Sequence, residues 1–213
     1  MKSDKIEKYI KNNVTLEFNY PDKDKMKVID NTKTPELFVN HFYELCNGEF
    51  PNNINTVTYP PNQNTFAVTY YGKNKGENKF TNEYRDCWIR RCQVTYPSLV
   101  RDMHFTYLLH DYNNKFDLFD DIEYSVDYDV NKGADVVIKH DNETYYVNLY
   151  VNTNKSQNFI DKKKSVRHPE HDYIEIHIPI DKKDSKKIQL SNGKDMWLYS
   201  KKHIKQIRNQ IYN

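Results

Sequence analysis

The stretch Gly133 to Thr153, GADVVIKHDNETYYVNLYVNT, holds the residues whose types and spacing best suit chemistry. It alternates like a β-hairpin, and Asp135 starts the first strand directly after a glycine turn. Asp135 can offer a hard carboxylate oxygen to Mg²⁺, which lowers the pKa of bound water and absorbs charge during phosphodiester hydrolysis. The second strand carries Asn148 and Tyr150 where such a centre needs another carboxylate and a lysine.

Two further interpretations of this hairpin remain open. An Asp that follows Gly at a turn often bonds backbone amides and holds the hairpin in register, with Asn148 and Tyr150 forming a packed polar face. Alternatively, the missing groups have moved to neighbouring elements. Lys139 shares the face of Asp135 because strand side chains alternate with a period of two. Lys155 follows the second strand, and Glu123 can supply a second carboxylate from the adjacent strand.

The elements before residue 81 follow from periodicity and from turn residues. We expect a helix over 3–12, a strand over 13–20, a helix from the cap Thr34 to the stop Gly48, a loop over 50–64, a strand over 64–72 and an exposed turn over 73–79. His41 lies on the apolar stripe of the second helix, and we expect it to be a hydrogen-bonded core residue.

The elements after residue 81 form the densest pattern. We expect helices over 81–96 and 97–112 separated at Pro97, a three-strand meander over 121–153, a basic helix over 154–168, a strand over 172–181, another over 195–200 and a last helix capped by Ser200. The strand over 172–181 should place Ile174, Ile176 and Ile178 on one face.

This order resembles the restriction-endonuclease-like PD-(D/E)XK fold over roughly residues 81–199. The resemblance implies an α/β (α+β) protein with an α-β-β-β-α-β core, whose mixed sheet is flanked by helices. Residues 81–213 would form this core, and residues 1–80 an N-terminal α+β extension. It also implies that Asp135 is the first acid of the motif, while Asn148 and Tyr150 occupy the places of the second acid and the lysine. The motif is therefore degenerate, and only an active centre would use Mg²⁺, held by Asp135 and Glu123 with Lys139 or Lys155 nearby.

Basic residues gather in two places that suit a nucleic-acid backbone. The stronger cluster contains Lys155, Lys162, Lys163, Lys164 and Arg167, although a solvated helix face is the alternative. Arg90 and Arg91 lie on the helix before the sheet, with Tyr and Trp side chains available to stack on bases.

The composition narrows the class of protein. The net charge of +2 makes the chain no polycation, and 18 Tyr and 10 Phe must supply much of the core, with partners for the buried hydroxyl groups. The three cysteines suit a reducing compartment. With no membrane span or signal peptide in the sequence, we expect a cytoplasmic location, and the Lys-, Asn- and Ile-rich usage hints at a low-GC bacterium or its phage.

Three hypotheses follow. The first is a non-catalytic, nuclease-like accessory or regulatory protein of a phage or mobile element, which engages nucleic acid or a host protein and needs no cofactor. The second is an active Mg²⁺-dependent endonuclease that uses Asp135 with a relocated acid and lysine. The third is a protein-binding inhibitor or structural subunit whose acidic stretch over 111–129 forms the interface. A homodimer is compatible with each.

Overall fold

A computed structural model describes residues 1–30, 38–47, 49–51, 53–77, 79–125, 127–129, 133–151 and 174–213. The protein is a mixed α+β structure with one four-stranded mixed sheet and one small two-stranded sheet in this part of the chain. Its contacts divide it into two compact units: residues 1–3, 104–188 and 197–213 form the first, and residues 4–103 and 189–196 form the second. The domain boundary expected at residue 80 stays a prediction.

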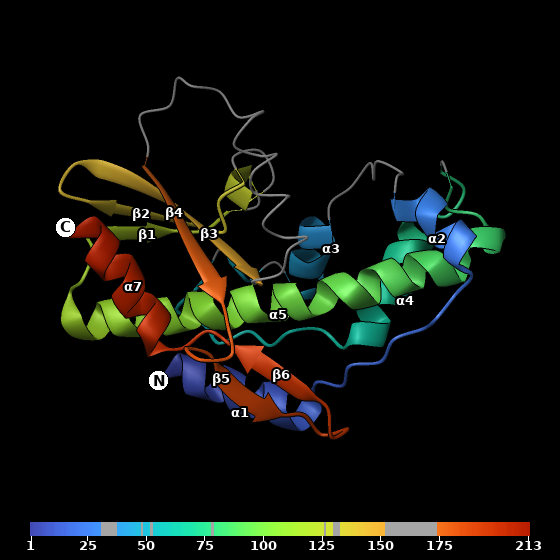
Figure 1. Ribbon diagram of the computed structural model, residues 1–213, viewed down its shortest axis with the longest axis horizontal. Helices are drawn as coiled ribbons and strands as arrows, with labels where there is room; N and C mark the ends of the chain where they lie inside the picture. Colours follow the sequence, from blue (N-terminus) through green and yellow to red (C-terminus); the bar gives the residue numbers. More distant parts are fainter. Residues whose placement is uncertain are drawn as a thin grey trace. The chain divides into compact units, whose positions relative to one another are not determined.

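The first unit is built on the four-stranded sheet (Figure 1). Its strands are β1 (Asp121–Glu123), β2 (Val136–His140), β3 (Glu143–Val151) and β4 (Ile174–Ile180), which lie in that order. The first three strands are antiparallel neighbours, and β4 runs parallel to β3. Asp141 and Asn142 turn β2 into β3 with positive φ angles of 49° and 66°, a conformation that Asp and Asn tolerate well. The expected meander is therefore confirmed, as is the fourth strand.

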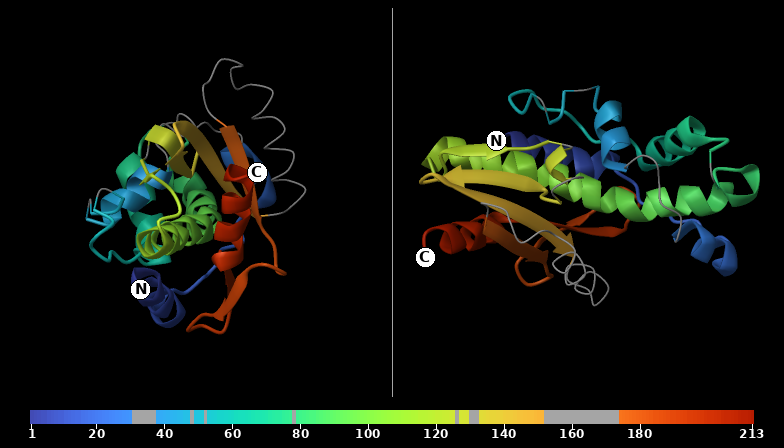
Figure 2. Two further views of the ribbon diagram at one scale, coloured as in Figure 1. Left: turned by 90° about the vertical axis from the view of Figure 1, so that its left-hand side faces the viewer. Right: turned by 90° about the horizontal axis from the view of Figure 1, so that it is seen from above.

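Helices cover the apolar side of this sheet. The core contains Val136, Ile138, Val147, Ile176 and Ile178 from the strands. Phe105, Leu108 and Leu109 of α5 (Arg85–Phe116) pack against them, together with Ile204 and Ile207 of α7 (Lys201–Ile211). Figures 1 and 2 show the last part of α5 running beneath the strands and α7 lying beside β4. The expected last helix and its Ser200 cap are confirmed, because the Ser200 hydroxyl accepts the Lys202 N–H at 3.2 Å.

The second unit is mainly helical and has an aromatic core. It contains most of α1 (Lys2–Asn13), together with α2 (Lys23–Asp30), α3 (Phe38–Leu45), α4 (Gln63–Asn74), the short 3₁₀ helix η1 (Asn82–Tyr84) and the first part of α5. Phe80 and Trp88 stack at a centroid distance of 3.8 Å, and both are fully buried. Tyr96 is also fully buried, and its hydroxyl donates to the Pro61 carbonyl at 2.5 Å. The expected pairing of buried tyrosine hydroxyl groups is confirmed here.

His41 behaves as expected for a core histidine. Its ring is buried on α3, and Nε2 lies 2.8 Å from the Thr69 hydroxyl. The proposed cap Thr34 and stop Gly48 of this helix lie outside the described residues.

Two strands expected in the first eighty residues are wrong. Residues 64–72 lie in α4, where Asn62 accepts the N–H groups of Asn64 and Thr65. The aromatic residues of this segment are buried at helical spacing, so tertiary packing overrides their strand propensity. Residues 14–20 belong to no strand. All regular elements in the described part of residues 1–80 are helices.

The break expected at Pro97 is also wrong, because α5 continues from Arg85 to Phe116. Proline has no N–H, so the carbonyl of Gln93 loses its usual helical partner. The side chain of Gln63 supplies the missing donor, since its Nε2 donates to the Gln93 carbonyl at 3.0 Å. A buried amide from α4 thus compensates for the proline.

The strand expected over 195–200 forms, but outside the main sheet. It is β6 (Asp195–Leu198), which pairs with β5 (Lys186–Gln189), a strand that the sequence did not predict. Among the described residues of 121–130, only Asp121–Glu123 (β1) form the strand that was expected to be longer.

Candidate functional site

The carboxylate of Asp135 is bound to the backbone of the neighbouring strand. Its Oδ2 accepts the N–H of Leu149 at 2.5 Å, while its own N–H donates to the Val147 carbonyl at 2.9 Å. The regular β2–β3 pairing ends at Val136, whose partner is Val147, and these two bonds fasten the residue before it to β3. Asp135 therefore holds the end of the hairpin in register, as the structural interpretation of this residue predicts.

The positions expected to complete the motif lie on adjacent strands. Asn148 follows Val147 on β3 and is paired with His177 of β4, whereas Asp135 immediately precedes β2 and bonds to Val147 and Leu149, the two neighbours of Asn148. Neighbouring strands lie about 4.8 Å apart, so the three residues form a short row across the sheet. Tyr150 lies two residues beyond Asn148, on the same face of β3, where it pairs with Pro179.

The chemistry of this row differs from that of a metal-dependent hydrolase. Asn148 is 9% exposed and offers a neutral amide in place of a carboxylate. Burial raises the pKa of the Tyr150 phenol above its ordinary value of 10, so this side chain is neutral at pH 7 and cannot act as a base or as a cation. A single carboxylate that already accepts a backbone N–H holds Mg²⁺ poorly.

The candidate replacements on the other strands bind each other. Glu123 lies opposite Val137, so Lys139 is its diagonal neighbour on β2. It forms its ion pair with Lys139, through Oε1, and its Oε2 accepts the Tyr128 hydroxyl at 2.8 Å. The Lys139 ammonium, with help from the Tyr128 hydroxyl, lowers the pKa of the Glu123 carboxyl. The geometry brings Glu123 and Lys139 together rather than bringing both to Asp135.

Comparison of the chain with family models, with curated proteins and with solved structures gave no match. The site therefore has to be judged on its own geometry.

A dyad on β4 was missed by the sequence analysis. His177 Nε2 lies 3.1 Å from Oε2 of Glu175, and the two residues occupy the face of β4 opposite the buried isoleucines. The alternation of Ile174, Ile176 and Ile178 could have predicted this pair, because Glu175 and His177 lie between them and must share the opposite face of the strand. The dyad extends the polar row of Asp135 and Asn148 to a third strand.

One set of metal-type ligands occurs in the described part of the chain, at the opposite end of β2. His140 Nδ1 lies 3.5 Å from Asp120 Oδ1, whereas His140 Nε2 lies 3.6 Å from Asp141 Oδ2. One ligand atom from each of the three residues lies within 4.8 Å of the other two, but both carboxylates are exposed, and exposed acidic groups commonly gather in this way without an ion. Asp120 also accepts the Asp141 N–H at 2.9 Å, which closes the end of the hairpin. The cluster therefore carries no argument for a bound metal.

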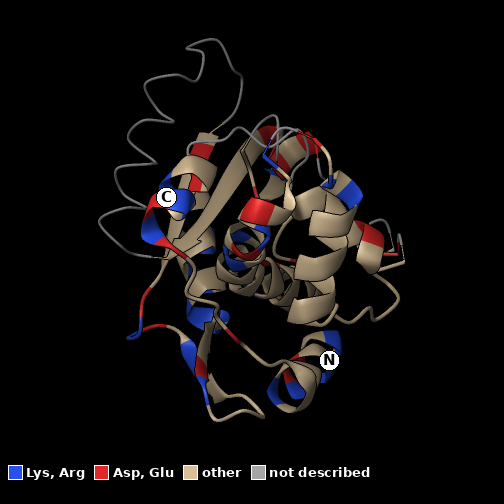
Figure 3. Ribbon diagram, turned by 90° about the vertical axis from the view of Figure 1, so that its right-hand side faces the viewer, with Lys and Arg blue, Asp and Glu red and all other residues tan. Residues whose placement is uncertain are grey.

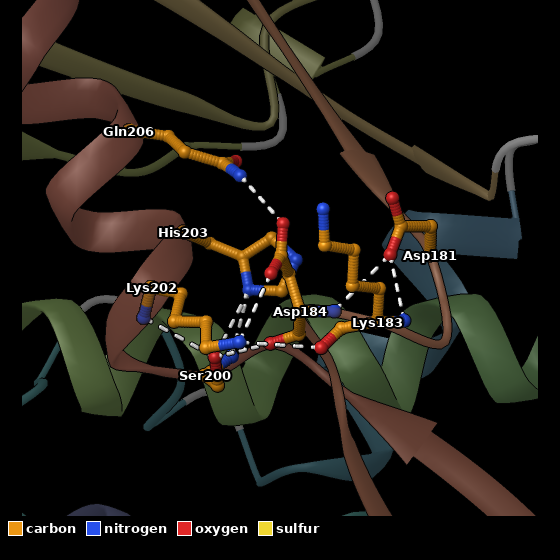
Figure 4. A network of polar contacts seen from close by, with 7 residues as sticks. All are labelled: Asp181, Lys183, Asp184, Ser200, Lys202, His203 and Gln206. Carbon is orange, nitrogen blue, oxygen red and sulfur yellow. Dashed lines mark hydrogen bonds and ion pairs between the residues drawn. The ribbon is translucent and has the colours of Figure 1, made fainter.

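A second polar network lies at the start of α7 (Figure 4). Asp181 accepts the N–H groups of Lys183 and Asp184, and the Asp184 carboxylate accepts from Lys202 at 3.1 Å and from Gln206 at 3.2 Å. His203 Nδ1 accepts the Ser200 N–H at 2.9 Å and completes the capping box. These bonds join the β4–β5 turn to α7, and they serve the fold.

Only two of the basic residues expected to bind nucleic acid, Arg90 and Arg91, lie in the described part of the chain. Lys155, Lys162, Lys163, Lys164 and Arg167 lie outside the described residues. Arg91 has a structural contact, because its Nη1 donates to the Ile29 carbonyl at 2.6 Å. Arg90 instead lies over two aromatic rings, those of Phe18 and Tyr20. Elsewhere charges of both signs mix, and Figure 3 shows them interspersed along α1.

Several carboxylates of the acidic stretch over 111–129 have partners within the first unit. Asp111 accepts the Ser3 N–H and hydroxyl at 2.7 Å each. Asp120 and Glu123 are engaged as described above. These groups help to hold the fold, and phosphate mimicry by the stretch stays a hypothesis.

Proposed function

We propose that this protein is a nuclease-like binding protein that engages nucleic acid without cleaving it. Its core would follow the restriction-endonuclease-like α-β-β-β-α-β order, with a phosphodiesterase centre that has lost its metal ligands. The row on the sheet would then be a remnant of that centre, in which Asp135 has a purely structural role.

The order of elements supports the topology. The helix α5 precedes the antiparallel meander of β1, β2 and β3, and β4 follows in parallel to β3. A parallel pair needs a crossover of a dozen or more residues, commonly a helix. The chain between β3 and β4 is long enough for one, and we expected a basic helix there. Residues 154–168, where this helix was expected, lie outside the described part of the chain.

The observation that carries the loss of catalysis is the 2.5 Å bond between Asp135 Oδ2 and the Leu149 N–H. In a working centre this carboxylate would be a metal ligand and would act with a second carboxylate and a lysine. Here the facing side chain is Asn148, Tyr150 carries no charge, and Glu123 forms an ion pair with Lys139. Among the described residues, these contacts commit Asp135 to the β3 backbone and Glu123 to Lys139, which supports the proposed loss of metal binding.

Incubation of purified protein with plasmid, single-stranded DNA and RNA in Mg²⁺ or Mn²⁺ tests this proposal, with binding measured on the same substrates. We expect binding at low salt and intact substrates. Metal-dependent cleavage that Asp135→Ala abolishes would show an active endonuclease instead. If no oligonucleotide binds at low salt, the proposal fails, and a protein partner that contacts residues 111–129 becomes the leading hypothesis.

A further inference from the structure

An extended segment of the second unit is held in place by two buried glutamines. The N–H of Glu17 donates to Gln63 Oε1 at 2.7 Å, and the N–H of Asn19 donates to Gln93 Oε1 at 2.7 Å. Gln63 and Gln93 are themselves buried, at 3% and 5% exposure. Alternate backbone N–H groups are thus anchored as in a strand, although the partners are side chains.

The carbonyl side of the segment is anchored as well. The Leu16 carbonyl accepts Asn192 Nδ2 at 3.0 Å and the ammonium of Lys194 at 2.6 Å. Both donors lie in the turn between β5 and β6, within the same unit. The segment is therefore preorganised from both sides, at an ordering cost already met by folding.

This anchoring presents two aromatic rings around a cation. Phe18 and Tyr20 are two residues apart, and their ring centroids lie 4.9 Å and 5.2 Å from the Arg90 guanidinium. The Lys194 ammonium lies 5.0 Å from the Phe18 ring. Together Phe18, Tyr20, Arg90 and Lys194 form what we call the aromatic–cation cluster.

Two features of the cluster are unusual for a purely structural contact. Tyr20 is 87% exposed, so most of its ring is open to solvent. Arg90 Nη1 is buried against the rings and has no hydrogen-bond partner among the described residues. An exposed ring beside two cations offers stacking and charge, the two interactions that bind single strands without sequence readout.

We infer that the aromatic–cation cluster is a binding site for single-stranded nucleic acid. A base stacks on the open face of Tyr20, and the adjacent phosphates lie near Arg90 and Lys194. The Phe18 ring also contacts the Arg90 guanidinium and helps to hold it beside Tyr20. This inference rests on the proposed function, but it places binding on a surface distinct from the sheet.

Fluorescence anisotropy with a labelled oligothymidine and an RNA strand of the same length, at low salt, tests the inference. We expect Tyr20→Ala to weaken binding by about five- to a hundredfold, because stacking contributes strongly for each base, whereas Tyr20→Phe keeps the affinity. Tyr59→Ala, at an exposed tyrosine of the same unit, is the matched control and should change little. Arg90→Gln and Lys194→Gln should each reduce the salt slope by about one, and Lys75→Gln should not.

The outcomes separate the two proposals. If the native protein binds strands but Tyr20→Ala and Arg90→Gln bind equally well, the aromatic–cation cluster is wrong, while the proposed function stands. If the native protein binds no strand, the proposed function itself fails, and this inference fails with it. The site is also wrong if duplex and single strand bind equally well and Tyr20→Ala changes neither affinity. Such binding would depend on the charge of the phosphate backbone alone, without stacking. Since Tyr20 is exposed, an unchanged thermal melt of Tyr20→Ala excludes misfolding as the cause.

Discussion

Gln63 donates its side-chain N–H to the carbonyl of Gln93, four residues before Pro97, and so completes the helix that the proline would otherwise interrupt. The same Gln63 accepts the Glu17 N–H through its oxygen. One buried amide therefore couples the continuity of α5 to the position of the segment that carries Phe18 and Tyr20.

This coupling predicts non-additive stability. Gln63→Leu leaves the Gln93 carbonyl and the Glu17 N–H without their partner, so it should lower the free energy of unfolding by about 1–3 kcal/mol. Pro97→Ala restores a backbone donor for Gln93, and the loss caused by Gln63→Leu should shrink in that background. Urea unfolding of the double-mutant cycle measures the difference. Full additivity would contradict the proposed compensation.

Asp135 should matter for stability. Asp135→Ala removes the acceptor of the Leu149 N–H and should lower the free energy of unfolding by about 1–3 kcal/mol. Asp135→Asn retains an acceptor oxygen and should cost less. Denaturant titration of the two variants, with Asp195→Ala at an exposed position of β6 as a control, makes the comparison. If Asp135→Ala is as stable as the native protein, the register role is wrong.

The pair of Glu123 and Lys139 should be nearly dispensable. Both side chains are partly exposed, at 29% and 46%, and solvent screens their attraction. Lys139→Met and Glu123→Gln should each leave the urea midpoint of unfolding nearly unchanged. A nucleic-acid cleavage activity that appears in the native protein and disappears in either variant would instead assign them a catalytic role.

Stability should fall in mild acid because of His203. Burial lowers the pKa of His203 below the ordinary value of 6.5, although the nearby carboxylates of Asp184 and Asp181 act in the opposite direction. The unfolded chain then binds the proton more tightly than the folded protein. The contribution of neutral His203 to the free energy of unfolding is therefore complete above about pH 6.5, and it decreases as the pH falls toward the lower pKa of the folded state. His110 should add a decrease of the same sign, since burial also lowers its pKa. Chemical unfolding between pH 5 and 8, with His203→Gln as the comparison, should show a shallower slope in the variant. An equal slope would contradict this assignment.

The hairpin and the last helix could be predicted because local signals agree there. Alternating residues of β2 and β3, the Asp141–Asn142 turn and the Ser200 cap each point to the structure that forms. The role of Asp135 was also among the sequence-based interpretations, since a turn aspartate commonly binds backbone amides.

Other features depend on contacts between distant residues. Residues 64–72 have strand-type composition, but burial of Phe66, Ala67 and Tyr70 against the aromatic core selects a helix. The continuity of α5 depends on Gln63, which lies 30 residues before Gln93. The aromatic–cation cluster likewise needs glutamines on two helices to hold the segment of Phe18 and Tyr20, and no local pattern encodes this arrangement.

The central claim is that the protein binds nucleic acid with a disabled phosphodiesterase centre. The most direct test incubates native protein and Asp135→Ala with labelled single-stranded DNA in Mn²⁺, and follows binding and cleavage in one reaction. We expect a retarded, intact strand for both proteins, since the Asp135 carboxylate binds the backbone of β3. Cleavage by the native protein that requires Mn²⁺ and is lost in Asp135→Ala would contradict it.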